Sequence, residues 1–228
     1  MSHNSARYRQ AGELLAGYGL ILRGGFWPSG EDEVPGAPAT LLLVGNAGPA
    51  MWESFSVLPI EGENALDQWS KCAIDAVADK LGATALYPFG GTPFLPFLRW
   101  AQKAEAVKPS PIGMMMHSEY GLWHAYRGAL CFSERLGLPT ADERDHPCDS
   151  CDDKPCLGGC PVNAFSGGSY DVPACAAHLA TDDGVDCMSL GCRARRACPA
   201  GAPYRYEPDQ AAFHMQAFRG ARPMSDNE

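Results

Sequence analysis

Apolar and polar residues alternate along the first 140 residues in patterns that predict both helices and strands. The apolar run of residues 39–48 is typical of a buried strand. Residues 64–82 repeat apolar side chains at three- and four-residue steps, which predicts a helix with one apolar face. Asn64 can cap this helix and Gly82 can end it. The positions on the apolar face are Leu66, Trp69, Ala73, Val77 and Leu81.

Shorter patterns predict further elements, and together they indicate a sheet with helices packed around it. Ser5 is a possible N-cap of the first helix, and Pro96 is expected in the first turn of another. Phe213 and Phe218 are expected to anchor a helix near the end of the chain. The expected helices cover residues 5–19, 49–57, 94–106 and 204–220, and the expected short strands cover residues 20–26 and 83–89.

The composition changes near residue 140, where cysteine, aspartate, glycine and proline begin to dominate. This change predicts a larger domain in residues 1–140, a cysteine-rich module in residues 141–203 and a tail in residues 204–228.

Charge and hydropathy exclude several classes of protein. The formal net charge of −9 argues against broad binding of nucleic acids or anionic membranes, because both depend on Lys and Arg. No apolar run is long enough to cross a bilayer. The first residues lack the apolar core of a signal peptide, so we expect a cytoplasmic protein.

The ten cysteines are distributed very unevenly. Cys72 and Cys131 stand alone in apolar segments and are expected to be buried and unreactive. Because disulfides are rare in a reducing cytosol, the remaining cysteines are expected to bind metal. They are Cys148, Cys151, Cys156, Cys160, Cys175, Cys187, Cys192 and Cys198.

The spacing of these cysteines resembles that of bacterial ferredoxins. Three close cysteines are followed by a fourth and a proline, and the fourth typically ligates the other cluster of a pair. The gap before the third cysteine is four residues here, where two are usual. The later group also ends in Cys-Pro. We therefore predict two [4Fe–4S] clusters with crossed ligation, one held by Cys148, Cys151, Cys156 and Cys198, the other by Cys160, Cys175, Cys187 and Cys192.

Other interpretations of these residues stay open. Structural zinc could use the same thiolates but leaves the two Cys-Pro pairs unexplained, and disulfides or a single cluster with spare cysteines are further alternatives. The arginines between two predicted ligands could raise a cluster's potential or dock an acidic electron donor. Equally, they could balance nearby acidic residues. The arginines are Arg193, Arg195 and Arg196, and the acidic residues are Asp142, Asp145, Asp149, Asp152 and Asp153.

The segment MMMHSEYGLWHAYRGALCF, in residues 114–132, resembles cobalamin-processing proteins of the CblC type. Scattered similarity in the same order extends over roughly residues 20–132. The cysteine module resembles that of epoxyqueuosine reductases and corrinoid-dependent reductive dehalogenases. The matching positions in the CblC-like segment are His117, Tyr120, Gly121, Trp123, Ala125, Arg127 and Gly128.

These resemblances imply an α+β fold: a flavin-reductase-like mixed sheet with flanking helices, plus a small C-terminal ferredoxin-like iron–sulfur module. They imply a cobalamin site at His117, Tyr120, Trp123 and Arg127. They also imply an oxidoreductase of the cobalamin reductase or decyanase kind, with a corrinoid and a low-potential electron donor as partners. The alternatives are purely structural: Arg127 forms a buried ion pair, His117 caps a strand and the aromatic rings belong to the hydrophobic core. A ferredoxin-like electron-transfer protein without corrinoid chemistry is the competing function.

Overall fold

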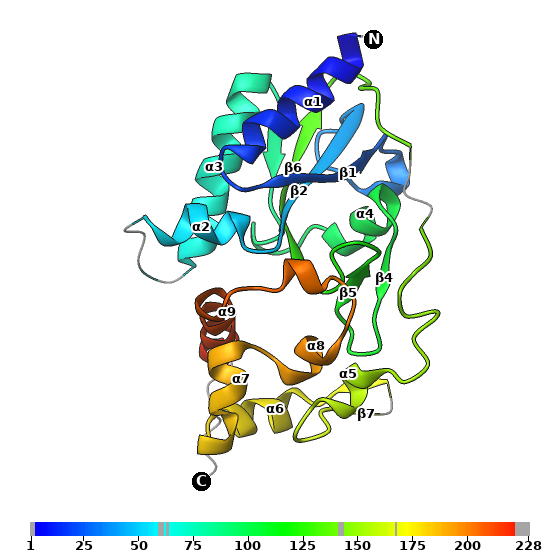
Figure 1. The fold of residues 1–228 in the computed structure, drawn as a ribbon. Helices are drawn as coiled ribbons and strands as arrows, with labels where there is room; N and C mark the ends of the chain where they lie inside the picture. The colour runs from blue at the N-terminus through cyan, green and yellow to red at the C-terminus, as the bar shows by residue number, and fades with distance from the viewer. Residues whose placement is uncertain (1–2, 59–61, 63, 141–143, 167, 222–228) are drawn as a thin grey trace. The chain divides into compact units, whose positions relative to one another are not determined.

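The computed structural model describes residues 3–58, 62, 64–140, 144–166 and 168–221, which form two compact units (Figure 1). The first unit contains residues up to 106 together with 124–144, and the second contains 107–123 together with the chain from 145 onward. Residues 107–123 thus group with the cysteine-rich part. The domain boundaries expected from composition stay predictions. The one at residue 140 adjoins undescribed residues 141–143, and the tail beyond residue 221 lies outside the described part.

The first unit is built on a four-stranded sheet in the order β1-β2-β6-β3. All of its strand pairs are antiparallel, where the resemblance implied a mixed sheet. The strands are β1 (Ile21–Phe26), β2 (Thr40–Ala47), β3 (Thr84–Leu86) and β6 (His124–Phe132). Leu41 to Val44 of β2 are fully buried, because this strand lies between two others and is covered by helices. This burial of β2 explains the unbroken apolar run of residues 39–48 in the sequence.

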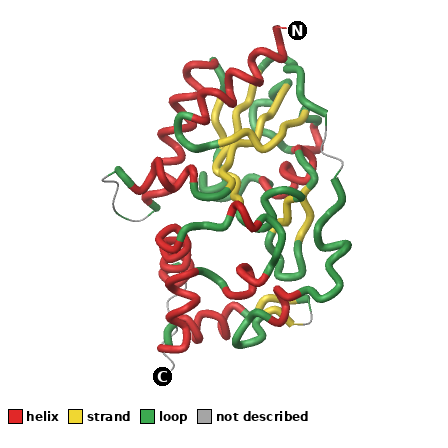
Figure 2. The backbone as a smooth tube through the Cα atoms, in the orientation of Figure 1, coloured by secondary structure: helices red, strands yellow, loops and turns green. Residues whose placement is uncertain are grey.

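Four helices pack around this sheet: α1 (His3–Ala16), α2 (Ala50–Ser56), α3 (Ala65–Leu81) and α4 (Phe97–Ala104). Helices α1 and α3 contact each other as well as strands, and α4 contacts β1 and β2 (Figures 1 and 2). The five apolar positions predicted for the face of α3 are all buried. Asn64 does occupy the N-cap of α3, although its side chain makes no capping hydrogen bond.

The second unit consists of short helices and two-stranded pairs. Strands β4 (Val107–Pro109) and β5 (Met115–His117) form one pair, and β7 (Phe165–Ser166) and β8 (Ser169–Tyr170) form the other. The helices are α5 (Pro155–Gly158), α6 (Val172–Leu179), α7 (Val185–Leu190), α8 (Arg193–Ala197) and α9 (Pro208–Gly220). Single turns of 3-10 helix lie at Asp182–Gly184 and Ala202–Tyr204, and a third lies at Gly30–Asp32 in the first unit.

The structure confirms the helices and strands expected from the sequence, with small changes at their ends. Helix α1 begins at His3, so the prediction that Ser5 caps it is wrong. Pro96 occupies the N-cap of α4. Helix α9 lies in the stretch expected to be helical, and it packs on α7. No helix in the described part of the chain combines the length and the apolar character needed to cross a membrane.

Candidate metal centre

One cavity of the second unit is lined by four of the clustered cysteines. It measures about 260 Å³, and its cysteines are Cys148, Cys151, Cys156 and Cys198. Two of them lie in a loop, one lies in α5, and Cys198 directly follows α8. Cys156 and Cys198 are buried, and the two loop cysteines are half-buried. These four are the set that the sequence analysis assigned to one cluster.

The two extra residues between Cys151 and Cys156 are accommodated at the surface. Asp152, Asp153 and Lys154 are exposed, and Lys154 has a left-handed backbone conformation with a φ of 39°. Its ammonium group donates a hydrogen bond of 3.2 Å to the Cys151 carbonyl oxygen, and α5 begins at the next residue. The longer gap therefore bulges into solvent, and Cys156 still reaches the shared cavity.

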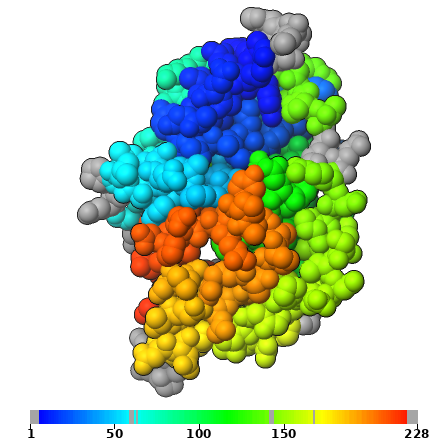
Figure 3. All heavy atoms as spheres, viewed as in Figure 1, coloured from blue at the N-terminus to red at the C-terminus, as the bar shows by residue number. Residues whose placement is uncertain are grey.

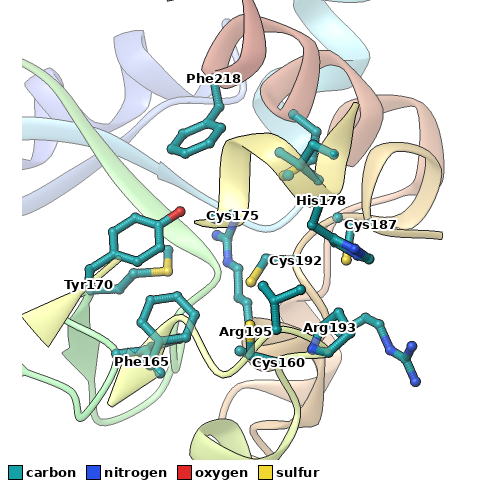
Figure 4. Close-up of a pocket in the computed structure, with 18 of the residues that line it drawn as sticks. Cys160, Phe165, Tyr170, Cys175, His178, Cys187, Cys192, Arg193, Arg195 and Phe218 are labelled. Atoms are coloured by element: carbon teal, nitrogen blue, oxygen red, sulfur yellow. The ribbon is translucent and has the colours of Figure 1, made fainter. Parts of the chain in front are cut away.

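A second cavity of the same unit, about 410 Å³ in volume, is lined by the other four clustered cysteines. They are Cys160, Cys175, Cys187 and Cys192. Helices α6 and α7 carry two of them, and Cys192 is the N-cap of α8. Figure 4 shows these four side chains in one region, and in the space-filling view the surface is open between the gold and orange segments of this unit (Figure 3).

Helices α5 and α8 distribute the cysteines between the two cavities. Cys192 and Cys198 flank α8, whose five residues span only about 7.5 Å at 1.5 Å per residue. The helices pack closely at Gly159, where an added Cβ would lie 2.9 Å from the Ala197 Cβ. Cysteines that are near neighbours in sequence thus point into different cavities. This is the geometry that crossed ligation requires.

Several of the thiols carry raised pKa values. Burial raises the pKa of Cys148, Cys156, Cys192 and Cys198, and neighbouring cysteines add to the rise. Backbone N–H groups of Ala194 and Arg195 oppose this effect at Cys192, and the N–H of Ala200 does so at Cys198. Thiolates gathered in this way need a bound cation to remain deprotonated, because metal ligation favours the ionised thiol.

Both cavities are lined by residues with buried hydrogen-bonding atoms that have no partner in the part of the chain that the structure describes. Ser110 Oγ lines the smaller cavity, and Trp123 Nε1 and His178 Nε2 line the larger one. A buried polar group without a partner costs free energy, so such groups are rare. The sulfurs of an iron–sulfur cluster accept hydrogen bonds. Four thiols and at least one such polar side chain per cavity fit a [4Fe–4S] cluster in each.

The geometry also bears on the alternatives for the cysteines. All ten lie in the described part of the chain, and none of them forms a disulfide. Among the described residues, no three His, Cys, Asp or Glu side chains converge closely enough to hold a single metal ion. Structural zinc needs four ligands about 2 Å from one ion.

The residues predicted to contact cobalamin fall into different units. In the second unit, His117 is buried and stacks on the Tyr120 ring at 4.3 Å. Its Nδ1 accepts hydrogen bonds from the backbone N–H groups of Glu119 and Tyr120. Trp123 is buried and lines the larger cysteine cavity. Arg127 belongs to the first unit, where its guanidinium lies 3.7 Å from the Asp67 carboxylate. Their role in binding a corrinoid stays a prediction.

The two isolated cysteines differ from each other. Cys131 is buried as expected, and burial raises the pKa of its thiol to about 12. Cys72 is exposed on α3, so the prediction that it is buried is wrong. The apolar face of α3 lies at neighbouring positions, and Cys72 falls just outside it.

Sequence reasoning did not single out Ser110 or His178. Ser110 lies in a turn far from the cysteines along the chain, and no spacing marks it. His178 follows Cys175 by three residues on α6. That spacing places both on one helical face and could have indicated a shared cavity.

Comparison with known proteins gives similarity in structure only. No family model and no curated protein matches the sequence. An epoxyqueuosine reductase from Streptococcus thermophilus is 15% identical, with a TM-score of 0.55 over 92% of this chain and 70% of that one. A B12-trafficking protein CblC from C. elegans is 14% identical, with a TM-score of 0.54 over 100% of both chains.

This chain shares the fold of these two proteins. A further epoxyqueuosine reductase structure, solved with a modified tRNA stem loop, has a TM-score of 0.51 and 14% identity over 90% of this chain and 71% of that chain. The resemblance predicted from the sequence, to CblC-type proteins and epoxyqueuosine reductases, is thereby confirmed at the level of the fold. Identities this low carry no argument about substrate.

Proposed function

We propose that this chain is an iron–sulfur redox protein that binds a corrinoid and reduces it through two [4Fe–4S] clusters. Reduction would remove the upper axial ligand of the corrinoid or maintain its cobalt in a reduced state. The observation that carries the proposal is the division of eight cysteines into two four-cysteine cavities within one unit. Two such sites next to each other are suited to passing single electrons.

The corrinoid part of the proposal rests on the fold shared with a B12-trafficking protein over both whole chains. We assign a flavin-reductase-like arrangement to the sheet domain and a ferredoxin-like character to the cysteine module. The residues proposed to contact the corrinoid are His117, Tyr120, Trp123 and Arg127. A low-potential electron donor protein would supply the electrons.

The clusters, when bound, would take up and pass on one electron at a time. The residues of the chain have other tasks. Four of the eight cysteines are buried, and backbone N–H groups near Cys192 and Cys198 stabilise the thiolates. The buried polar atoms of Ser110, Trp123 and His178 at these cavities would donate hydrogen bonds to the cluster sulfurs. Burial and hydrogen bonding of this kind set the potential of a cluster.

The decisive experiment is anaerobic quantitation of iron and sulfide, followed by cobalamin titration of the same sample. Two clusters correspond to about eight iron and eight sulfide ions per chain, with broad absorbance near about 400 nm. The corrin spectrum is expected to shift on binding. Zinc without iron or sulfide would reject the clusters, and fully loaded protein that leaves the corrin spectrum unchanged would reject the corrinoid.

A second candidate is an electron-transfer protein without corrinoid chemistry. Two contacts favour it: Arg127 pairs with Asp67, and His117 accepts hydrogen bonds from the turn that follows it. Both side chains therefore have structural tasks that require no ligand. Intact clusters, an unchanged corrin spectrum and a reduced partner protein would identify this function.

We further propose that the protein acts in the cytoplasm and does not bind nucleic acid. One similar reductase was solved with a tRNA stem loop, so tRNA is the appropriate probe. The net charge of −9 opposes contact with phosphates. A labelled tRNA stem loop is expected to show no anisotropy change at physiological salt, and saturable binding would overturn this part.

A further inference from the structure

Helix α8 carries three arginines with different partners: Arg193, Arg195 and Arg196. Asp186, on α7, forms an ion pair with Arg196 and lies 3.7 Å from Arg193. Arg193 also extends into solvent, with 53% of its side chain exposed. A single carboxylate therefore compensates much of the charge of both, and water screens the rest.

Arg195 is held quite differently. Its Nε and Nη2 both donate to the Leu122 carbonyl oxygen, at 3.1 and 2.6 Å. The guanidinium carbon lies 4.3 Å from the centre of a Trp123 ring and 4.5 Å from that of Tyr206. Among the described residues, no carboxylate forms an ion pair with Arg195. Two aromatic faces and a carbonyl thus fix a cation in place without neutralising it.

This cation lines the larger cysteine cavity. Arg195 is one of its lining residues, and Figure 4 draws it among the labelled cysteines while Arg193 extends away from them. A partly buried cation without an anion is unfavourable. A [4Fe–4S] cluster with four thiolate ligands carries net negative charge, and the cavity that Arg195 lines is one of the two that we propose to hold such clusters.

We propose that Arg195 provides the counter-charge of the cluster in the larger cavity and thereby makes it the more easily reduced of the two. This inference rests on the proposed function, which supplies the clusters. Reduction adds one electron and therefore one negative charge. A fixed cation stabilises the reduced form more than the oxidised form. No bond of the chain forms or breaks in this step.

The hydrogen-bonding groups of the two cavities support the same order of reduction. Among the described residues, the buried side-chain atoms without a hydrogen-bond partner include Trp123 Nε1 and His178 Nε2 at the larger cavity and Ser110 Oγ at the smaller one. The cation above the Trp123 ring makes its N–H a stronger donor. Near the smaller cavity, Lys154 and Arg205 are both exposed, so water screens their charges.

The test is an anaerobic potentiometric titration with dithionite as the one-electron donor, followed by electron paramagnetic resonance. The wild type is expected to reduce in two waves. Arg195→Gln should lower the equilibrium constant for the more positive wave by roughly tenfold, equivalent to about 59 mV, and leave the other in place. Arg193→Gln is the matched control, since that arginine lines the same cavity but is exposed and faces Asp186, and it should move neither wave.

Two further variants guard against misfolding of Arg195→Gln. Arg195→Lys keeps the charge and should leave the more positive wave near its original position. Trp123→Phe keeps an aromatic ring but removes the indole N–H, and should move that same wave to a more negative potential. Unchanged waves in Arg195→Gln, or equal shifts in Arg193→Gln, would overturn the proposal while the two clusters stand. Protein without iron and sulfide would overturn the proposed function as well.

Discussion

At the scale of single residues, Asp32 shows how a buried carboxylate holds a turn of the first unit together. Its oxygens accept hydrogen bonds from the backbone N–H and hydroxyl of Ser29 and from the Lys103 ammonium. Its backbone carbonyl accepts one from the Trp100 indole at 2.8 Å. Burial by itself raises the pKa of Asp32, but the bonds from Lys103 and Ser29 outweigh it and lower the pKa below 3.8.

Replacing Asp32 with Asn should therefore destabilise the protein in a pH-dependent way. A carboxyl group whose pKa is lowered on folding contributes stability above its unfolded pKa, and loses it as the pH falls through its folded pKa. We expect Asp32→Asn to lower the free energy of unfolding by about 1–3 kcal/mol at pH 7, from the loss of charged hydrogen bonds. The difference from the wild type should shrink as the pH falls below about 4.

Denaturant unfolding of the wild type and variant at each pH measures this difference. Glu13→Gln, at an exposed position of α1, is the matched control and should show little effect at any pH. A pH-independent difference between wild type and Asp32→Asn would contradict the role given to the ionised carboxylate.

At the scale of elements, two glycines explain why residues 107–123 belong with the cysteines. Gly121 and Gly201 both have positive φ, 58° and 71°. A Cβ on Gly121 would lie 2.1 Å from the Ala200 carbonyl oxygen, and one on Gly201 would lie 2.2 Å from that of Tyr120. The two backbones cross in direct contact, so the turn after β5 is packed against the segment that follows Cys198.

Gly121→Ala should therefore destabilise the protein far more than the penalty of a left-handed backbone conformation alone would. Gly113 also has a positive φ, of 78°, but no atom lies within 4 Å of an added Cβ. We expect Gly113→Ala to cost about 1 kcal/mol, the ordinary penalty of the left-handed conformation. Gly121→Ala should exceed about 3 kcal/mol, because backbone atoms on both sides must move.

Measurements of thermal unfolding and of iron content in Gly121→Ala and Gly113→Ala test this expectation. Movement of Ala200 would displace Cys198, so Gly121→Ala should also lose iron from the smaller cavity. Similar small losses of stability in both variants, with full iron content, would argue against the close backbone contact.

At the scale of the whole molecule, the crossed distribution of cysteines is the feature on which the proposed function depends. Cys156 and Cys160 are separated by three residues yet line different cavities. Cys198 returns from the later group to join the smaller cavity. Each proposed cluster would therefore tie together segments distant in sequence, and losing a ligand should affect folding as well as redox chemistry.

Cys160→Ala and Cys156→Ala should each remove about half of the iron, but from different clusters. With the order of potentials proposed above, Cys160→Ala should abolish the more positive wave and Cys156→Ala the more negative one. Paramagnetic resonance during reduction distinguishes these outcomes. Cys72→Ala, at an exposed position outside both cavities, should leave both reduction waves unchanged. Loss of the same wave in both ligand variants would indicate one site formed by Cys148, Cys151, Cys156 and Cys160.

The sequence by itself determined most elements of the first unit, though not strand β6, and it predicted how the cysteines are grouped. Buried strand β2 and helix α3 were recognisable because an unbroken apolar run and a helical apolar period are both local properties of the sequence. The cysteine grouping was predicted from spacing that resembles that of bacterial ferredoxins. The two predicted groups of four cysteines line two separate cavities.

Only the tertiary structure decided which distant residues share those cavities. Nothing near Ser110 or His178 marked them as partners of the cysteines, and three similar arginines could not be told apart by charge alone. The structure pairs Arg193 and Arg196 with Asp186 and leaves Arg195 between two rings. Such differences arise from contacts between segments far apart in sequence, where packing rather than local pattern sets each side chain's neighbours.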